Sequence, residues 1–229
     1  MRVLALEAAT EVCSVALLVD GGLIKRTMES GKSNARQILS MAEELMAEAQ
    51  VSLAMLDGIA ASIGPGAFTG VRITVAVAQG LAFGASLPVV PVSTLESLAL
   101  WVLKDGGSRA LACLDARMGE IYWGCYAADA VRGVMASGAP CVGPPESVTL
   151  SPSGHYVGVG RGFSAYPNLG KILGLKIGPA EMAALPNAAE TARLGTLRLV
   201  AGEGIDAADL KPLYLRDKVA LTESERAAR

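Results

Sequence analysis

The stretch VLALEAATEVCSVALLV (residues 3–19) decides the fold, because a related stretch, LACLDARMGEIYWGCY (residues 111–126), follows later in the chain. In each stretch an apolar strand ends in a carboxylate and an alanine, with Glu7 in the first and Asp115 in the second. A short polar turn then leads into a second apolar strand. A repeat of this kind is typical of a duplicated structural unit. We therefore expect an α/β protein of two related halves.

Further helices and strands fill out both predicted halves. A linker at residues 104–108 divides the chain into residues 1–107 and 108–229, and the final helix and strand are free to pack back on the first half. Local patterns predict a hairpin turn at residues 20–22, a helix with Ser33 as its N-cap, a helix over about 69–83, a helix capped by Ser93 or Thr94, a helix over 188–200 with Gly202 at its C-terminal end, and a strand over 213–216.

Composition favours a protein with a large core. The chain has 229 residues, of which 52% are hydrophobic, and its mean hydropathy is +0.41. The formal net charge is −2, and we find no run of like charges. Nucleic-acid binding by this chain alone is therefore not expected, because phosphate contacts need a basic stripe.

The cysteines and the apolar runs indicate a soluble, cytoplasmic protein without membrane contact. The four cysteines form no CxxC pair, which favours reduced, buried thiols. Glu7 and Glu11 interrupt the apolar N-terminal segment, so it does not have the pattern of a signal peptide. The longest uncharged run, residues 73–95, is long enough to span a membrane, but its glycines and prolines favour a buried helix followed by a turn and a strand.

Few residues are suited to catalysis. His155 is the only histidine, which excludes histidine-pair metal motifs, and no serine lies in a G-x-S-x-G elbow. Glu7 and Asp115 lie at strand ends, where carboxylates can hold Mg²⁺ or orient a nucleophile. The alternative, which we favour, is that each caps its turn by accepting backbone N–H bonds. We expect no metal site and no cofactor.

The glycine-rich loop at the start of GPGAFTGVRITVAVAQGLA (residues 64–82) is a candidate phosphate-binding site. A helix N-terminus can bind an anion, but a Walker A loop ends in Gly-Lys-Ser/Thr, and Pro65 removes one donor. We interpret Thr69 as the N-cap of the helix that follows. That helix is apolar on nearly every side, so either the chain buries it completely or a second protein covers one face.

Several blocks of the sequence resemble the bacterial TsaB (YeaZ) family. They are LALEAATEVCSVALL, GPGAFTGVRITVAVAQGLA, PVVPVSTLESLA, LDARMGEIYWGCY, VGVGRGFSAYPNLG and LKPLYLRDKVA, which together extend over nearly the whole chain. The resemblance implies an actin/hexokinase/Hsp70-like (ASKHA) fold of two duplicated α/β lobes. It also implies a role in forming N6-threonylcarbamoyladenosine at position 37 of tRNA.

The resemblance further implies how such a protein acts. TsaB-like proteins are thought not to catalyse the transfer; they pair with the catalytic paralogue TsaD, and the complex recruits the ATPase TsaE. The shared surface is a bundle of the first two helices of each protein, and the same helices form homodimers in isolation. On this chain the implied partner-binding residues are Asn34, Gln37, Met41, Arg72, Val75, Ala78 and Gln79.

Departures from the family pattern agree with a non-catalytic role. The usual Asp-Thr-Ala/Ser ending of the first strand is Glu7-Ala8-Ala9 here, which disfavours phosphate chemistry and makes Glu7 and Asp115 at most a vestigial nucleotide site. Asn34 and Ile38 stand at the spacing where the paralogue carries two histidines. The leading hypothesis is thus a scaffold subunit, and the alternative is a small-molecule kinase or ATPase of the same fold. A metallopeptidase, as the older label glycoprotease suggests, lacks its ligands.

Overall fold

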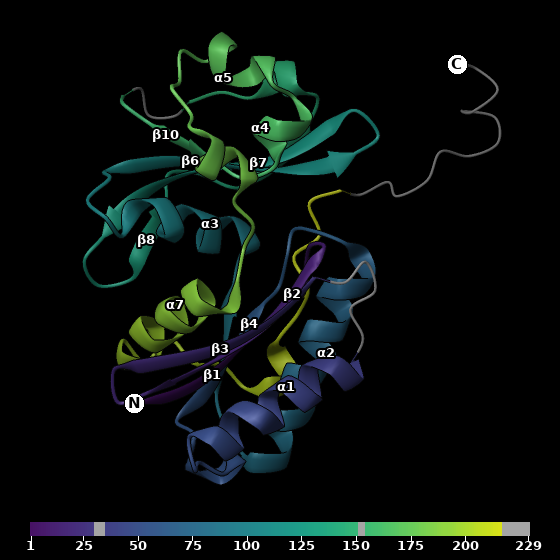
Figure 1. Ribbon diagram of the computed structural model, residues 1–229, viewed down its shortest axis with the longest axis vertical. Helices are drawn as coiled ribbons and strands as arrows, with labels where there is room; N and C mark the ends of the chain where they lie inside the picture. Colours follow the sequence, from purple (N-terminus) through teal and green to yellow (C-terminus); the bar gives the residue numbers. More distant parts are fainter. Residues whose placement is uncertain (30–34, 151–153, 217–229) are drawn as a thin grey trace, which may run out of the picture.

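A computed structural model describes residues 1–29, 35–150 and 154–216 of the chain. It contains two five-stranded sheets, stacked with helices between them and on both outer sides (Figure 1). The layers follow from the alternation of side chains along the strands. Leu4 and Leu6 of the first strand point to one core cluster, and Val3 and Ala5 point to another.

The first sheet has the strand order β3-β2-β1-β4-β5. Its strands are β1 (Arg2–Glu7), β2 (Val12–Val19), β3 (Gly22–Glu29), β4 (Gly58–Ser62) and β5 (Val89–Val92). β1, β2 and β3 form an antiparallel meander, while β4 and β5 are parallel to β1. The predicted hairpin turn joins β2 to β3, with positive φ angles of 48° at Asp20 and 92° at Gly21.

Helices cover both faces of the first sheet. α1 (Ala35–Glu48) and α2 (Phe68–Ala85) lie on the outer face, with the short 3₁₀ helices η1 (Leu53–Met55) and η3 (Ala207–Asp209) beside α2. α3 (Thr94–Leu103) and α7 (Ala188–Val200) lie on the inner face, between the two sheets (Figure 1). The C-terminal α7 thus packs on β1, β2 and β4 of the first sheet.

The second sheet repeats the plan of the first. β6 (Arg109–Arg117) pairs antiparallel with β7 (Glu120–Asp129) and parallel with β10 (Val157–Val159), as β1 pairs with β2 and β4. β8 (Gly133–Ala136) and β9 (Cys141–Gly143) extend the β7 side, and η2 (Pro145–Ser147) follows β9. The outer face is covered by α4 (Gly162–Ala165) and α5 (Asn168–Ile172), and α6 (Pro179–Ala183) packs against α4 and β10. The duplication predicted from the sequence is confirmed.

Some of the capping residues predicted from the sequence lie at helix ends, and others do not. Ser93, one of the two predicted cap residues, caps α3 and forms a capping box with Glu96, and Gly202 lies just past α7 with φ 74°, as predicted. The prediction that Thr69 is an N-cap was wrong: the cap position is Ala67, two residues earlier, and its backbone N–H bonds to the carbonyl oxygen of Ala9. The predicted N-cap Ser33 lies outside the described residues.

The segment Leu213–Arg216 is irregular, although we expected a strand there. A single backbone bond, from Leu213 N–H to the carbonyl oxygen of Ile63 at 2.8 Å, attaches it to the end of β4. The expected ladder does not form because Tyr214 and Arg216 are instead held by side-chain contacts to α2 and to the second half.

Candidate functional site: an interlobe cleft and a helical groove

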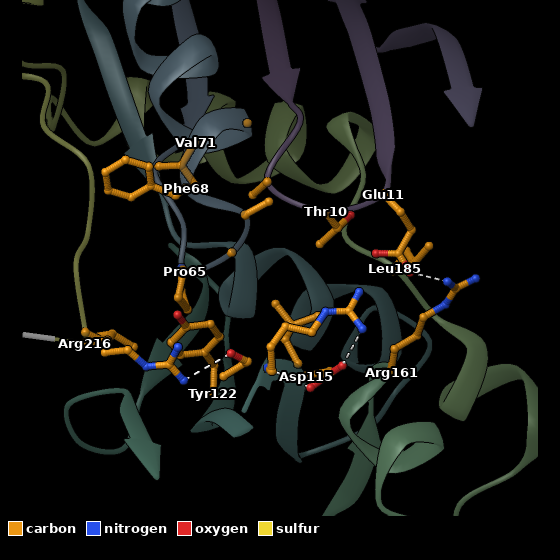
Figure 2. Close-up of a pocket in the computed structure, with 18 of the residues that line it drawn as sticks. Thr10, Glu11, Pro65, Phe68, Val71, Asp115, Tyr122, Arg161, Leu185 and Arg216 are labelled. Atoms are coloured by element: carbon orange, nitrogen blue, oxygen red, sulfur yellow. Dashed lines mark hydrogen bonds and ion pairs between the residues drawn. The ribbon is translucent and has the colours of Figure 1, made fainter. Parts of the chain in front are cut away.

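A cleft of about 1080 Å³ lies between the two halves of the molecule (Figure 2). The β1–β2 turn and the start of α2 form one wall, and the β6–β7 turn and the start of α4 form the other. Figure 2 shows Glu11 and Arg161 facing each other across this cleft, and the two side chains form an ion pair. On the other side, Arg216 donates to the carbonyl oxygen of Ala116 at 3.1 Å and pairs with Glu120.

The two carboxylates of the repeat occupy equivalent turns but different environments. Glu7 Oε1 accepts the N–H of Ala9 at 2.8 Å, and Asp115 Oδ1 accepts the N–H of Arg117 at 2.8 Å. Asp115 lines the cleft and also pairs with the Arg117 guanidinium at 3.0 Å. Glu7 is fully buried and does not line the cleft, so the structure does not bring the two carboxylates to one ligand site.

Burial sets the protonation of Glu7. Desolvation raises the pKa of Glu7 from 4.5 to about 7, and the hydrogen bonds from the Ala9 N–H and the Ser62 hydroxyl only partly offset this rise. Close to neutral pH a large fraction of this carboxyl is therefore protonated. A neutral, enclosed carboxyl is a poor ligand for Mg²⁺, which prefers ionised oxygens and retains water ligands.

The start of α2 is occupied by the chain itself. The Ala67 N–H donates to the Ala9 carbonyl oxygen at 2.6 Å. The backbone packs so closely that a Cβ on Gly66 would lie 2.1 Å from the Ala9 oxygen, and one on Gly70 would lie 1.9 Å from the Ala8 oxygen. Peptide carbonyls thus stand against the positive end of the helix, where an anion would otherwise bind.

No cluster of metal ligands is found in residues 1–29, 35–150 and 154–216: no three His, Cys, Asp or Glu side chains are placed to hold an ion together.

A second hollow, of about 720 Å³, runs along α1 and α2 on the outer side of the first sheet. We call it the helical groove. Its lining is almost entirely apolar and consists of Ala35, Leu39, Phe68, Thr69, Arg72, Ile73, Ala76, Val77, Gly80 and Leu81. Phe68 is 46% exposed and Leu39 is 38% exposed, so the groove is an open apolar face. α2 is long and apolar enough to cross a membrane by length and composition alone, but here its other face packs on the sheet.

The structure shows that only some of the predicted partner-binding residues are exposed. Met41, Val75 and Ala78 point into the core, with exposed fractions of 5%, 5% and 0%, so a partner cannot reach them in this fold. Arg72 is exposed and lines the helical groove. Gln79 is partly buried and donates to the carbonyl oxygen of Leu210 at 3.1 Å.

Two predicted partner-binding residues remain, Gln37 and Asn34. Gln37 is half-buried on α1, and Asn34 lies outside the described residues. Leu39, Phe68, Ile73, Ala76 and Leu81 were not predicted as site residues, although Ile73, Gly80 and Leu81 form a second apolar stripe that the sequence displays.

Two sheets, each built on an antiparallel hairpin whose first strand also pairs with a parallel strand, are separated by a cleft and define a duplicated α/β protein of the actin/hexokinase/Hsp70 (ASKHA) class. The profile of the TsaD family, described as tRNA N6-adenosine threonylcarbamoyltransferase, matches residues 28–143. TsaB of Escherichia coli K12, a tRNA threonylcarbamoyladenosine biosynthesis protein, is 39% identical over 96% of both chains. TsaB of Haemophilus influenzae Rd is 32% identical over 96% of this chain and 95% of that one.

A solved structure agrees with these relatives. YeaZ from Pseudomonas aeruginosa is 36% identical and superposes with a TM-score of 0.84, over 93% of this chain and 99% of that chain. The chain belongs to the TsaB (YeaZ) family of tRNA threonylcarbamoyladenosine biosynthesis proteins.

Proposed function

We propose that this chain is a non-catalytic subunit that supports N6-threonylcarbamoyladenosine formation in tRNA by pairing with a TsaD-type catalytic subunit. The observation that carries the proposal is the helical groove, an open apolar face on α1 and α2. Contiguous apolar surface of this kind is unfavourable in water and is typical of a protein–protein interface.

The chemistry of the groove fits a pair of partner helices. Ala76 and Gly80 are exposed on α2, and nothing lies within 4 Å of a Cβ placed on Gly80, so a partner backbone has room to approach closely. The TsaD family profile matches residues 28–143, which contain both groove helices. A TsaD-type protein therefore carries a segment similar to α1 and α2, and like helices can pack on like helices around a pseudo-twofold axis.

The packing of the β1–β2 turn against the start of α2 supports a non-catalytic role. A nucleotide phosphate that binds at a helix N-terminus needs free backbone N–H groups there. Here the carbonyls of Ala8 and Ala9 lie against that start, and the nearby Glu7 is buried with a raised pKa. Both features disfavour phosphate and Mg²⁺ binding at this turn.

Other partners follow from the same surface. In the absence of the catalytic subunit, a second copy of the chain covers the helical groove, and a TsaE-type ATPase joins only through the heteromeric complex. The net charge of −2 leaves most tRNA contact to the partner. We place the complex in the cytoplasm.

Co-purification with the TsaD-type protein of the same organism tests the proposal. Ala76→Glu places a charge in the groove at an exposed helical position, and we expect it to abolish the complex without unfolding the chain. Ala180→Glu makes the same change at an exposed position of α6, in the other half, and should leave binding intact. If the wild-type chain does not bind the partner, or if the chain alone transfers threonylcarbamoyl groups, the proposal is wrong.

A small-molecule kinase or ATPase is the second candidate, favoured by the 1080 Å³ cleft and its walls bearing Asp115, Arg117 and Arg161. Calorimetric titration with ATP and Mg²⁺ separates the two candidates. Heat of binding that Asp115→Asn abolishes, together with turnover, would support this candidate. Absence of binding in wild type would exclude it.

A further inference from the structure

Arg72 stands out among the arginines of the described chain. It is the only charged residue of α2, and it is also the only charged one among the described residues that line the helical groove. Eight other arginines in that part of the chain pair with a carboxylate: Arg2, Arg26, Arg117, Arg132, Arg161, Arg193, Arg198 and Arg216. Within residues 1–29, 35–150 and 154–216, no carboxylate lies within ion-pair distance of Arg72.

Two aromatic rings hold the Arg72 side chain in place. Its guanidinium carbon lies 3.5 Å from the centre of the Phe68 ring and 5.7 Å from the centre of the Tyr214 ring. Its Nε–H donates to the Tyr214 hydroxyl at 2.7 Å. The two rings are themselves 5.9 Å apart, with 34° between their planes. Stacking of this kind orients the guanidinium plane while its terminal nitrogens stay available.

Tyr214 is in turn fixed from both sides. Its neighbour Leu213 bonds to Ile63 at the end of β4, and Arg216 bonds to Ala116 and Glu120 in the second half. The orientation of Arg72 therefore rests on contacts with both halves of the molecule. An arginine ordered before binding loses less conformational entropy when it meets its ligand.

We propose that Arg72 is a preorganised receptor for the carboxylate of an acidic side chain on the TsaD-type partner. This inference rests on the proposed function. The planar guanidinium fork matches a carboxylate in a bidentate geometry. A charged contact at the edge of an apolar groove is the usual arrangement of a specific interface, where the apolar area supplies affinity and the ion pair fixes register. A nucleic-acid phosphate fits less well, because no other residue of α2 is charged and a backbone-binding surface needs several cations.

The test measures the affinity of the purified full-length chain for its TsaD-type partner at several salt concentrations. Arg72→Gln should weaken binding about ten-fold or more, and the remaining affinity should depend less on salt than that of wild type. Arg72→Lys keeps the positive charge but loses the bidentate geometry of the guanidinium and its stacking on the two rings, so its affinity should lie between those of wild type and Arg72→Gln. Lys171→Gln removes one positive charge on α5, at the opposite end of the molecule (Figure 1), and should bind as wild type does.

Tyr214→Phe tests the positioning part of the inference, because it keeps the ring but removes the acceptor of the Nε–H bond. We expect an intermediate loss of affinity and no change in thermal stability. Double-mutant cycles between Arg72 and the acidic residues of the partner's matching helices should reveal one strongly coupled pair.

The outcomes separate this inference from the proposed function. If wild type binds the partner and Arg72→Gln binds equally well with the same salt dependence, Arg72 is not the receptor, while the heterodimer stands. If no acidic residue of the partner couples to Arg72, or if Arg72→Gln weakens only tRNA binding by the complex, the carboxylate assignment is wrong. If wild type does not bind at all, the proposed function itself fails.

Discussion

The backbone N–H of Ala67 donates a hydrogen bond to the carbonyl oxygen of Ala9 across 2.6 Å, so α2 begins directly against the first turn of the chain. The N-cap residue Ala67 has no side chain that can cap the helix, and its own N–H is satisfied by this distant carbonyl. The same contact brings the backbone of the β1–β2 turn so close to α2 that only glycine fits at two positions, Gly66 and Gly70.

Gly70→Ala should therefore be strongly destabilising. The added Cβ would lie 1.9 Å from the Ala8 carbonyl oxygen, and neither backbone segment can yield without losing its own contacts. We expect a loss of about 3 kcal/mol in the free energy of unfolding, measured by urea denaturation. Gly80→Ala is the matched control in the same helix, because nothing lies within 4 Å of its Cβ; it should stabilise the chain by about 0.5–1 kcal/mol. A Gly70→Ala chain as stable as wild type would contradict the close packing at this turn.

The stability of the chain should decrease as the pH rises through the acidic range, because of Glu7. The folded pKa of Glu7 is about 7 and the reference value is 4.5, so at pH values below about 4.5 both states are protonated and Glu7 carries no penalty. Between these values the unfolded state ionises first, and the folded state loses stability until the pH exceeds about 7. The full effect is roughly 3 kcal/mol.

Glu7→Gln isolates this contribution, because the amide oxygen can still accept the Ala9 N–H. Its advantage over wild type in chemical denaturation should be small near pH 4.5 and should grow to its full value near pH 8. A difference between the two chains that stays constant across this range would show that Glu7 keeps an ordinary pKa in the folded protein.

The same substitution should be strongly destabilising at one position of α2 and nearly neutral at the next. Val75 is 5% exposed and packs in the core against the sheet, whereas Ala76 is exposed in the helical groove. Val75→Glu buries a carboxylate without a partner and should cost about 4 kcal/mol. Ala76→Glu should change the thermal midpoint of the isolated chain little. Circular dichroism melting of both variants checks this, and a cooperative, wild-type-like melt of Val75→Glu would mean that the two faces of α2 are assigned the wrong way round.

The contrast between Val75 and Ala76 shows which property of α2 could not be predicted from the sequence. The strand–turn–strand repeat around Glu7 and Asp115 is local, so its pattern predicted the two sheets correctly. The orientation of α2 is a tertiary property: a helix that is apolar on nearly every side has no polar stripe to indicate which face is inward. Val75 and Ala78 were therefore assigned to the partner surface, although the exposed stripe runs through Ile73, Ala76 and Gly80.

The same reasoning applies to the helix start and to the last described segment. Thr69 has the residue type of an N-cap, but the cap position is Ala67, whose N–H bonds to a carbonyl more than fifty residues away in sequence, and no local pattern reveals this contact. Leu213–Arg216 has an apolar, strand-like composition, yet its side chains contact both α2 and the β6–β7 turn. Contacts between distant segments decided both cases.

The pair formed by Arg198 and Glu96 should contribute much of the attachment of α7 to α3. Arg198 makes bonds of 2.7 and 3.2 Å to the two oxygens of Glu96, which also accepts the Ser93 N–H at 2.8 Å as part of the α3 cap. The side chains are only 12% and 17% exposed, so Arg198→Ala leaves a largely buried carboxylate without its partner. We expect a loss of about 2–3 kcal/mol in urea denaturation.

Arg132→Ala provides the comparison. Arg132 pairs with Glu203 at 2.9 Å, but the two side chains are 54% and 31% exposed, and solvent screens such a pair to below about 1 kcal/mol. The two variants remove the same residue type and the same kind of ion pair, so their difference measures burial and the capping role of Glu96. Equal losses would contradict the view that this pair fixes α3 and α7 between the two sheets, and would instead assign their attachment to the apolar contacts alone.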